Sequence, residues 1–248
     1  MTNEKEYLPK RALCIHAHPD DQEFSVAGTL AKWAKAGCEI ISVVITSGDS
    51  GSNDPSKGAE YKTELAKLRE GEQTAANNII GVKETIFMRH PDGELEPTIA
   101  LRKELTRIIR QHKPDVVITG NPEAWFYGNE YINHPDHCAA AQAACEAVFP
   151  SAGSRLIFAD LLSEGFEPHE VKRLYVHGTE KPDTWVDISE TMDIKVEALQ
   201  QHASQIPVDE VGKWMRDWAK EDAKDKDFEY AESYKVMILK NEEAEHEQ

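Results

Sequence analysis

Several features that would assign a protein to a broad class are missing from this chain of 248 residues. No run approaches the ~20 consecutive apolar residues of a membrane-spanning helix. The opening residues, MTNEKEYLPKR, lack the apolar core of a secretory signal. Four cysteines are scattered along the chain without a Cys-x-x-Cys pair or a framework spacing. We therefore expect reduced thiols in a cytoplasmic protein that does not bind a membrane.

Positive charge is scarce, because 28 Lys and Arg face 45 Asp and Glu, giving a net charge of −17. This balance argues against sequence-independent binding to nucleic acid or to an anionic membrane. Hydrophobic residues make up 40% and charged residues 29%, a composition typical of a globular protein. No internal repeat or low-complexity linker is visible, so we expect one domain over residues 1–240 and a flexible acidic tail at 241–248.

Short apolar runs alternate with stretches that have helical periodicity. The predicted strands are Arg11–Ile15, Glu39–Thr46, Asp115–Thr119, Arg173–His177, Trp185–Ile188 and Tyr234–Leu239. Helices are predicted between them, including one over Glu60–Ile80 with Leu65 and Leu68 on its inner face, and one over His137–Val148. Strands that are apolar throughout indicate a Rossmann-like α/β fold, with a mostly parallel sheet covered by helices on both faces.

Two polar clusters occupy places where such a fold binds ligands, at the carboxyl ends of strands. The first, His18-Pro19-Asp20-Asp21, directly follows the first predicted strand. The second, His134-Pro135-Asp136-His137, follows the strand Asp115–Thr119 after a long loop. In each cluster two potential ligands stand three residues apart just before a helix, which lets their side chains converge. A single cluster of this kind is often an ordinary polar loop or a helix cap, but two in equivalent places favour a metal site.

A zinc site built for hydrolysis needs three nitrogen or oxygen ligands and leaves the fourth position to water. His18, Asp21 and His137 fit this need. Asp20 is the candidate base for the attacking water. These spacings alone predict a metal-dependent hydrolase, in which zinc, iron or another divalent ion is compatible with the ligands.

The second polar cluster, just before the predicted helix His137–Val148, offers two further candidates for catalysis. His134 is placed to stabilise a developing oxyanion and then to protonate a leaving amine. Asp136 either accepts a hydrogen bond from His134 or orients a metal ligand through a hydrogen bond on the side away from the metal.

The string AHPDD at Ala17–Asp21, together with HPDH at His134–His137, resembles the PIG-L/LmbE-like family of zinc-dependent N-acetyl deacetylases. Further segments agree in order along the chain: Thr46–Gly51, Arg69-x-x-Glu72, Pro91-Asp92-Gly93, and Lys195 through Gln205. The resemblance implies zinc ligation by the three residues named above, with Asp20 as general base and His134 as oxyanion-stabilising group or acid. It also implies that an N-acetylglucosamine-type sugar, free or conjugated, loses acetate.

Substrate contacts are expected from Asp49, Arg69, Asp92, Tyr131 and His202. Asp49 stands where relatives carry a longer acid, and Tyr131 where they often carry a glycine-tyrosine-glycine stretch. Alternatives remain for three of them. Arg69 is equally well explained as the partner of Glu72, Asp92 as a turn residue, and His202 as the end of a helix.

Other aromatic and histidine residues are less informative. The loop aromatics Trp125, Phe126 and Tyr127 are expected either to form a sugar-stacking wall or lid, or simply to pack. Trp214 and Trp218 are expected on a helix face that docks on the core or on a partner subunit, so a homo-oligomer stays open. No convergent partner is predicted for His16, His90, His112 or His177.

Two alternatives compete with a deacetylase. An amidase could cleave a larger N-acyl or thiol-sugar conjugate at the same metal site. A non-catalytic protein that binds nucleotides or sugar phosphates is disfavoured, because no G-x-G-x-x-G follows the first strand. The carboxylates of Asp20 and Asp21 stand there instead, and they would repel phosphate.

Overall fold

The computed structural model describes residues 7–240, and its central element is a seven-stranded sheet of order β3-β2-β1-β4-β7-β9-β8. The strands are β1 (Arg11–His16), β2 (Glu39–Thr46), β3 (Glu84–His90), β4 (Val116–Thr119), β7 (Arg173–Val176), β8 (Thr184–Asp187) and β9 (Ala231–Ile238). Strands β3, β2, β1, β4 and β7 run parallel, whereas β9 is antiparallel to both β7 and β8. The expected Rossmann-like α/β fold with a mostly parallel sheet is confirmed.

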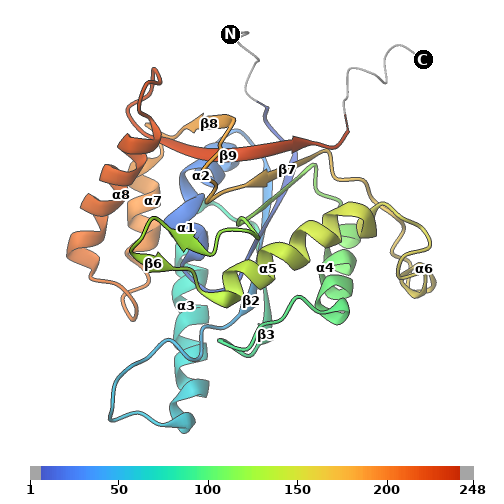
Figure 1. Ribbon diagram of the computed structural model, residues 1–248, viewed down its shortest axis with the longest axis horizontal. Coiled ribbons are helices and arrows are strands. Elements are labelled where there is room, and N and C mark those ends of the chain that lie inside the picture. Colours follow the sequence, from blue (N-terminus) through green and yellow to red (C-terminus); the bar gives the residue numbers. More distant parts are fainter. Residues whose placement is uncertain (1–6, 241–248) are drawn as a thin grey trace.

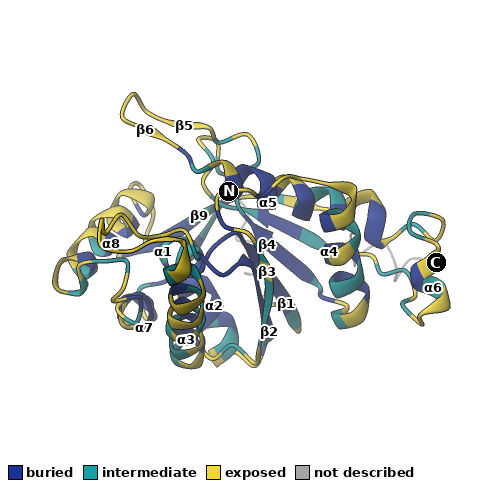
Figure 2. Cartoon of the chain, turned by 90° about the horizontal axis from the view of Figure 1, so that it is seen from below, coloured by how far each residue is buried: buried dark blue, intermediate teal, exposed yellow. Residues whose placement is uncertain are grey.

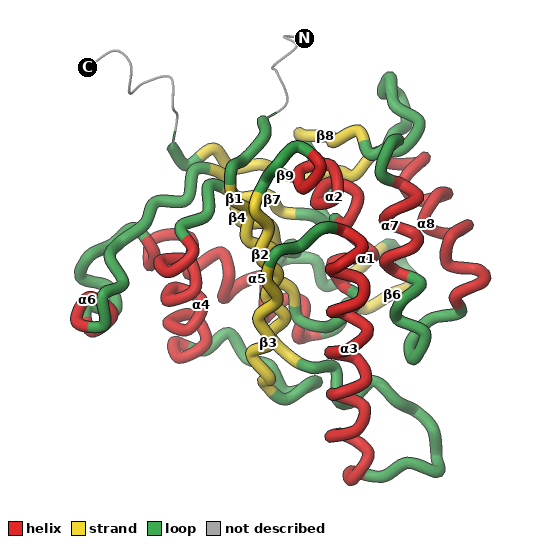
Figure 3. The backbone as a smooth tube through the Cα atoms, turned by 180° about the vertical axis from the view of Figure 1, so that it is seen from behind, coloured by secondary structure: helices red, strands yellow, loops and turns green. Residues whose placement is uncertain are grey.

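Helices cover both faces of this sheet (Figure 1 and Figure 3). One layer holds α1 (Asp21–Ser25), α2 (Ala27–Lys35), α3 (Lys62–Ile80), α7 (Met192–Leu199) and α8 (Val208–Asp222). The other holds α4 (Ile99–His112), α5 (Pro135–Glu146), a π-helical turn at Ala147–Ala152 and the short α6 (Asp160–Ser163). Figure 2 shows the two layers on either side of the buried strands.

The side-chain alternation of β1 explains why its sequence is apolar throughout. Ala12 and Cys14 belong to the core beneath α2, α7 and α8. Leu13 and Ile15 belong to the core beneath α4 and α5. Because consecutive side chains in a strand point to opposite faces, a strand covered on both sides needs apolar residues at every position.

Strand β3 was not predicted, and its place in the sheet explains why. It lies at the sheet edge, most of its side chains are partly exposed, and its ends are the polar residues Glu84 and His90. Its pairing with β2 also shifts register between Val44 and Thr46, where Arg89 has a φ of 61°. An edge strand with one irregular residue lacks the continuous apolar run that identifies a central strand.

The inner face of α3 differs from the prediction. Leu65 is buried, but Leu68 is 45% exposed. The side chains that face inward instead include the polar Arg69, Gln73 and Asn77. The apolar periodicity was misleading here because the inner stripe of this helix faces a buried polar network near the candidate site.

Some sequence expectations are not tested by the fold. The single domain over residues 1–240 stays a prediction, and the acidic tail at 241–248 lies outside the described residues. Within residues 7–240, no helix has the length and apolarity needed to cross a membrane.

Candidate metal centre

The two polar clusters occupy the carboxyl ends of the neighbouring strands β1 and β4. Asp21 is the first residue of α1, and Asp20 precedes it with a φ of 91°, a left-handed conformation that aspartate tolerates better than most residues. The second cluster begins α5, with His134 as its N-cap and Pro135 at its first turn. The fold therefore brings together side chains that are more than 110 residues apart in the sequence.

The side chains of His18, Asp21 and His137 converge on one point. His18 Nδ1 lies 3.1 Å from His137 Nε2, which lies 3.0 Å from one carboxylate oxygen of Asp21. The second Asp21 oxygen is 3.6 Å from His18 Nδ1. One ligand atom from each residue lies within 4.8 Å of the others, a spacing that can hold a metal ion. The arrangement matches the expected ligand set, although binding itself stays a prediction.

In both His18 and His137, one ring nitrogen faces the point where the three side chains converge. A hydrogen bond to the other ring nitrogen fixes this orientation. His18 Nε2 lies 2.9 Å from the carboxylate of Asp92 and 3.4 Å from that of Asp136. His137 Nδ1 lies 2.8 Å from the amide oxygen of Asn133. Because these oxygens accept hydrogen bonds, the proton of each ring is held on the far nitrogen. When the ring is neutral, its other nitrogen then carries a lone pair that faces the shared point, as metal ligation requires.

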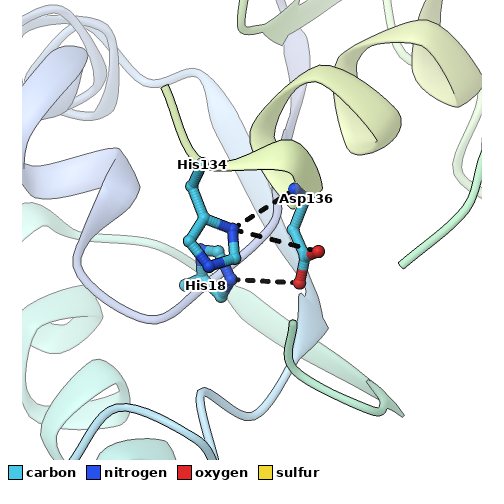
Figure 4. Close-up of side chains that lie close together, drawn as sticks. All are labelled: His18, His134 and Asp136. Carbon is cyan, nitrogen blue, oxygen red and sulfur yellow. Dashed lines mark hydrogen bonds and ion pairs between the residues drawn. The ribbon is translucent and has the colours of Figure 1, made fainter. Parts of the chain in front are cut away.

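A second group, His18, His134 and Asp136, also has the spacing of a metal site. Figure 4 shows the contacts that join these three side chains to one another. His134 Nδ1 accepts the backbone N–H of Asp136 at 3.2 Å. The Asp136 carboxylate accepts the backbone N–H groups of Gly93 and Leu95 and faces His18 Nε2. We therefore interpret the contacts of this group as holding the ligand His18 in place. Asp136 orients His18 and forms no side-chain hydrogen bond with His134.

Asp20 is held next to the candidate ligands in a buried position. Its carboxylate lies 3.1 Å from the guanidinium of Arg69, and its backbone N–H donates to Gln73. Burial raises the pKa of Asp20 to about 6, although Arg69 opposes the shift and the adjacent Asp21 adds to it. A carboxylate with a pKa near 6 is a suitable general base around neutral pH.

Arg69 has a different partner from the one considered in the sequence. It also donates to the carbonyl oxygens of Gly48 and Pro19. Glu72 instead accepts both the N–H and the hydroxyl of Ser204, so the alternative of an Arg69–Glu72 pair is corrected. Arg69 belongs to the buried face of α3, whereas Glu72 lies outside that face.

A cavity of about 980 Å³ opens over these groups. Its walls include the three candidate ligands and, of the other predicted site residues, Asp20, Arg69, Asp92, Tyr131 and His134. His134 is partly exposed there, and burial together with the charge of His18 lowers its pKa. Near pH 7 it is therefore neutral, with Nδ1 accepting a hydrogen bond and Nε2 as the N–H donor.

Two predicted substrate contacts do not reach this cavity in the structure. Asp49 accepts the backbone N–H of Asp92 and pairs with Lys62 at 3.3 Å. His202 is 0% exposed and lies 3.3 Å from the buried Glu23. Both residues lie behind the walls of the cavity and do not line it, and a substrate contact by either stays a prediction. The carboxylate of Asp92 is likewise engaged, by His18 and by the N–H of Ser50.

One pair missed by the sequence lies at the floor of the cavity. His16 Nε2 is 2.8 Å from His177 Nε2, and Cys14 Sγ is 3.3 Å from His16 Nδ1. Burial lowers the pKa of His16 to about 4 and that of His177 well below its usual value. His16 is the last residue of β1 and His177 directly follows β7, and these two strands are separated in the sheet by β4. Their proximity depends on strand order, which periodicity does not reveal.

Comparison with known proteins agrees with this geometry. The family model described as PIG-L, GlcNAc-PI de-N-acetylase, matches residues 13–148, which include both clusters. The chain belongs to this family. As a PIG-L protein it is an N-acetyl deacetylase by class, as the motifs predicted.

Individual PIG-L relatives cover most of the chain. The diacetylchitobiose deacetylase of Thermococcus kodakarensis is 34% identical over 200 residues, which are 81% of this chain and 72% of that protein. A 1D-myo-inositol 2-acetamido-2-deoxy-alpha-D-glucopyranoside deacetylase of Kineococcus radiotolerans is 30% identical and covers 58% of this chain and 46% of that protein. The solved N,N'-diacetylchitobiose deacetylase of Pyrococcus horikoshii aligns with a TM-score of 0.83 and 32% identity, covering 93% of this chain and 84% of that one.

Proposed function

We propose that this protein removes the N-acetyl group of an N-acetylglucosamine-type sugar or sugar conjugate with the help of one zinc ion. The observation that carries the proposal is the convergence of His18 Nδ1, His137 Nε2 and the Asp21 carboxylate, while the outer nitrogens are fixed by Asp92 and Asn133. Two imidazoles and one carboxylate suit zinc and leave room for a water molecule. The names of the relatives support the class of substrate.

The described side chains divide the reaction between them. A bound zinc ion would supply Lewis-acid polarisation of the amide carbonyl and a lowered pKa for the attacking water. Asp20 accepts the proton of that water, since its pKa of about 6 leaves it ionised at neutral pH. His134 donates a hydrogen bond from the cavity wall to the carbonyl oxygen as negative charge develops there. The proton taken up by the protein then passes to the leaving amine, which departs as the free amino sugar.

Release of acetate from N-acetylglucosamine and its conjugates tests this proposal. We expect activity in the zinc-loaded protein, loss of activity with a chelator, and recovery when zinc is restored. Asp20→Asn should lower kcat by about 10²- to 10⁴-fold. Asp54→Asn is the matched control, because Asp54 is an exposed loop residue that bonds only to nearby groups of its own loop.

Product analysis separates the two hydrolase candidates. A deacetylase releases acetate, whereas an amidase acting on a larger N-acyl or thiol-sugar conjugate releases a bulkier acid. Release that is insensitive to chelator, or full activity in Asp20→Asn, would contradict both.

A further inference from the structure

Polar side chains occupy part of the buried face of α3, where a helix that packs on a sheet normally carries apolar residues. Arg69 and Gln73 stand one helical turn apart on this face, and they are 4% and 0% exposed. Arg69 contacts the carboxylate of Asp20, whereas Gln73 has no role in the steps of the proposed reaction. A buried side-chain amide needs partners at both of its ends, so the partners of Gln73 show what it holds.

Arg69 and Gln73 hold the two ends of a single peptide group. The guanidinium of Arg69 donates to the carbonyl oxygen of Pro19 at 2.8 Å. The side-chain oxygen of Gln73 accepts the backbone N–H of Asp20 at 3.0 Å. The carbonyl and the N–H belong to the same peptide group, which joins Pro19 to Asp20. Two side chains of α3 therefore fix the plane of this peptide group from its opposite edges.

The plane of this peptide group sets the backbone conformation of the candidate base. Asp20 has a φ of 91°, which is unfavourable for a residue with a Cβ atom. On the other side of its Cα, the carbonyl oxygen of Asp20 accepts the backbone N–H groups of Glu23 and Phe24 at the start of α1. If the hold on the peptide group were lost, φ would relax toward negative values. The carboxylate would then shift relative to the candidate ligands.

The far end of the Gln73 amide determines which of its atoms faces Asp20. Its Nε2 donates to the carboxylate of Glu23 at 2.9 Å and to Oδ1 of Asn77 at 3.2 Å. Asn77 in turn donates from Nδ2 to the hydroxyl of Thr85 at 2.8 Å. Because two acceptors meet the far end of Gln73, its NH₂ group must lie there and its oxygen must face Asp20. Buried partners thus specify the orientation that the peptide group needs.

We propose that Gln73 is a positioning residue for the reaction, which holds the Pro19–Asp20 peptide group so that the Asp20 carboxylate stays directed at the attacking water. This inference rests on the proposed function, in which Asp20 is the general base. Gln73 does not line the cavity, so it acts only through Asp20. Its loss therefore lowers kcat and leaves KM and the Kd for zinc nearly unchanged.

Steady-state acetate release from N-acetylglucosamine by the zinc-loaded protein at pH 8 tests the proposal. Gln73→Met keeps the length of the side chain but removes the acceptor for the Asp20 N–H. We expect kcat to fall by about 10- to 100-fold, with KM and the zinc Kd within about twofold of wild type. A kcat within about twofold of wild type would overturn the proposal.

Gln22→Met is the matched control. Gln22 is 2% exposed and belongs to the same network, because its Nε2 donates to Glu23 and to Asn77. Its side chain makes no hydrogen bond to the Pro19–Asp20 peptide group. The control therefore removes buried hydrogen bonds of the same kind without releasing Asp20, and its kcat should stay within about threefold of wild type. An equal fall of kcat in Gln22→Met and Gln73→Met would overturn the proposal.

A paired substitution separates positioning from a general effect on packing. Gln73→Glu keeps an acceptor for the Asp20 N–H but brings a second carboxylate against Glu23. Adding Glu23→Gln supplies an NH₂ group there, and the neighbouring amides can turn over because the hydroxyl of Thr85 donates as well as accepts. We expect this double variant to recover most of the lost kcat, and Gln73→Met with Glu23→Gln to recover none. Equal kcat values in the two double variants would overturn the proposal.

Hydrogen exchange measured by NMR on the zinc-loaded protein tests the hold on the peptide group without turnover. Gln73→Met should speed exchange of the Asp20 amide by about tenfold or more, and leave the amide of Leu30, which donates to Val26 in α2, unchanged. If this change occurs but no N-acetylated sugar releases acetate, the proposed function fails and the hold on Asp20 stands. An unchanged Asp20 exchange rate in a protein that releases acetate overturns the hold and leaves the proposed function intact.

Discussion

Asp20 is expected to reduce the stability of the metal-free protein while it supports the reaction. Its folded-state pKa of about 6 lies above the usual aspartate pKa of 3.8, because burial disfavours the charged carboxylate more than Arg69 favours it. A group with a raised folded pKa contributes most to stability below its unfolded pKa. That contribution is lost as the pH rises through the folded pKa.

The structure sets the size of this effect. A difference of roughly two pKa units corresponds to about 3 kcal/mol, which we take as an upper value. Asparagine is nearly isosteric with aspartate and also tolerates the left-handed backbone at this position. Asp20→Asn should therefore lose activity and yet raise the free energy of unfolding by up to about 3 kcal/mol at pH 8, with almost no change below pH 4.

Urea unfolding of both proteins in the presence of a chelator, at several pH values between 4 and 8, measures this difference. Asp21→Asn is the control, because its change in the free energy of unfolding should have the opposite sign. Burial alone would raise the pKa of Asp21, but the facing His137 and His18 hold it well below its usual value. Losing that carboxylate should destabilise the metal-free protein at pH 8. If Asp20→Asn is destabilising at pH 8, or if its effect does not depend on pH, the reasoning about Asp20 is refuted.

Three further predictions concern the same site and its surroundings. Asn133→Ala should weaken zinc binding by about 10- to 100-fold in competition with a chelating dye, because His137 loses the acceptor that fixes its protonated nitrogen. The kcat/KM for acetate release should fall as the pH drops below about 6, where Asp20 becomes protonated, and a flat profile down to pH 4.5 would count against this base. Lys195→Met should destabilise the protein by about 3 kcal/mol in urea unfolding, because the buried Glu232 loses its counter-ion and keeps only its hydrogen bonds from Gly28, Thr29 and Tyr234. The exposed Lys224→Met should leave the midpoint unchanged.

The sequence predicts those parts of this molecule whose signals are local. The parallel core strands are apolar throughout because both of their faces are covered, so β1, β2 and β4 can be recognised without a structure. The candidate ligands His18 and Asp21 are similarly local, since both belong to one turn between a strand and a helix. Strand β3 escapes recognition because an edge strand needs no such continuous run.

What the sequence does not reveal depends on contacts between distant segments. Asn133 supports His137 from four residues away, but nothing in its residue type distinguishes it from an ordinary loop asparagine. His16 and His177 meet only because β1 and β7 lie on either side of β4. The burial of His202 likewise follows from the packing of α7 against α1 and α3, which a helical stripe alone cannot specify.

The most direct test of the account is the zinc X-ray absorption spectrum of the protein loaded with one zinc ion per chain. We predict an inner shell of nitrogen and oxygen at about 2.0–2.2 Å with the scattering of two imidazoles. His18→Ala and His137→Ala should each remove one imidazole contribution, whereas His169→Ala should change nothing, because that ring bonds the carbonyl oxygen of Pro114 before the amino end of β4. A sulfur ligand at about 2.3 Å, or a spectrum unaffected by both ligand substitutions, would contradict the proposed metal centre.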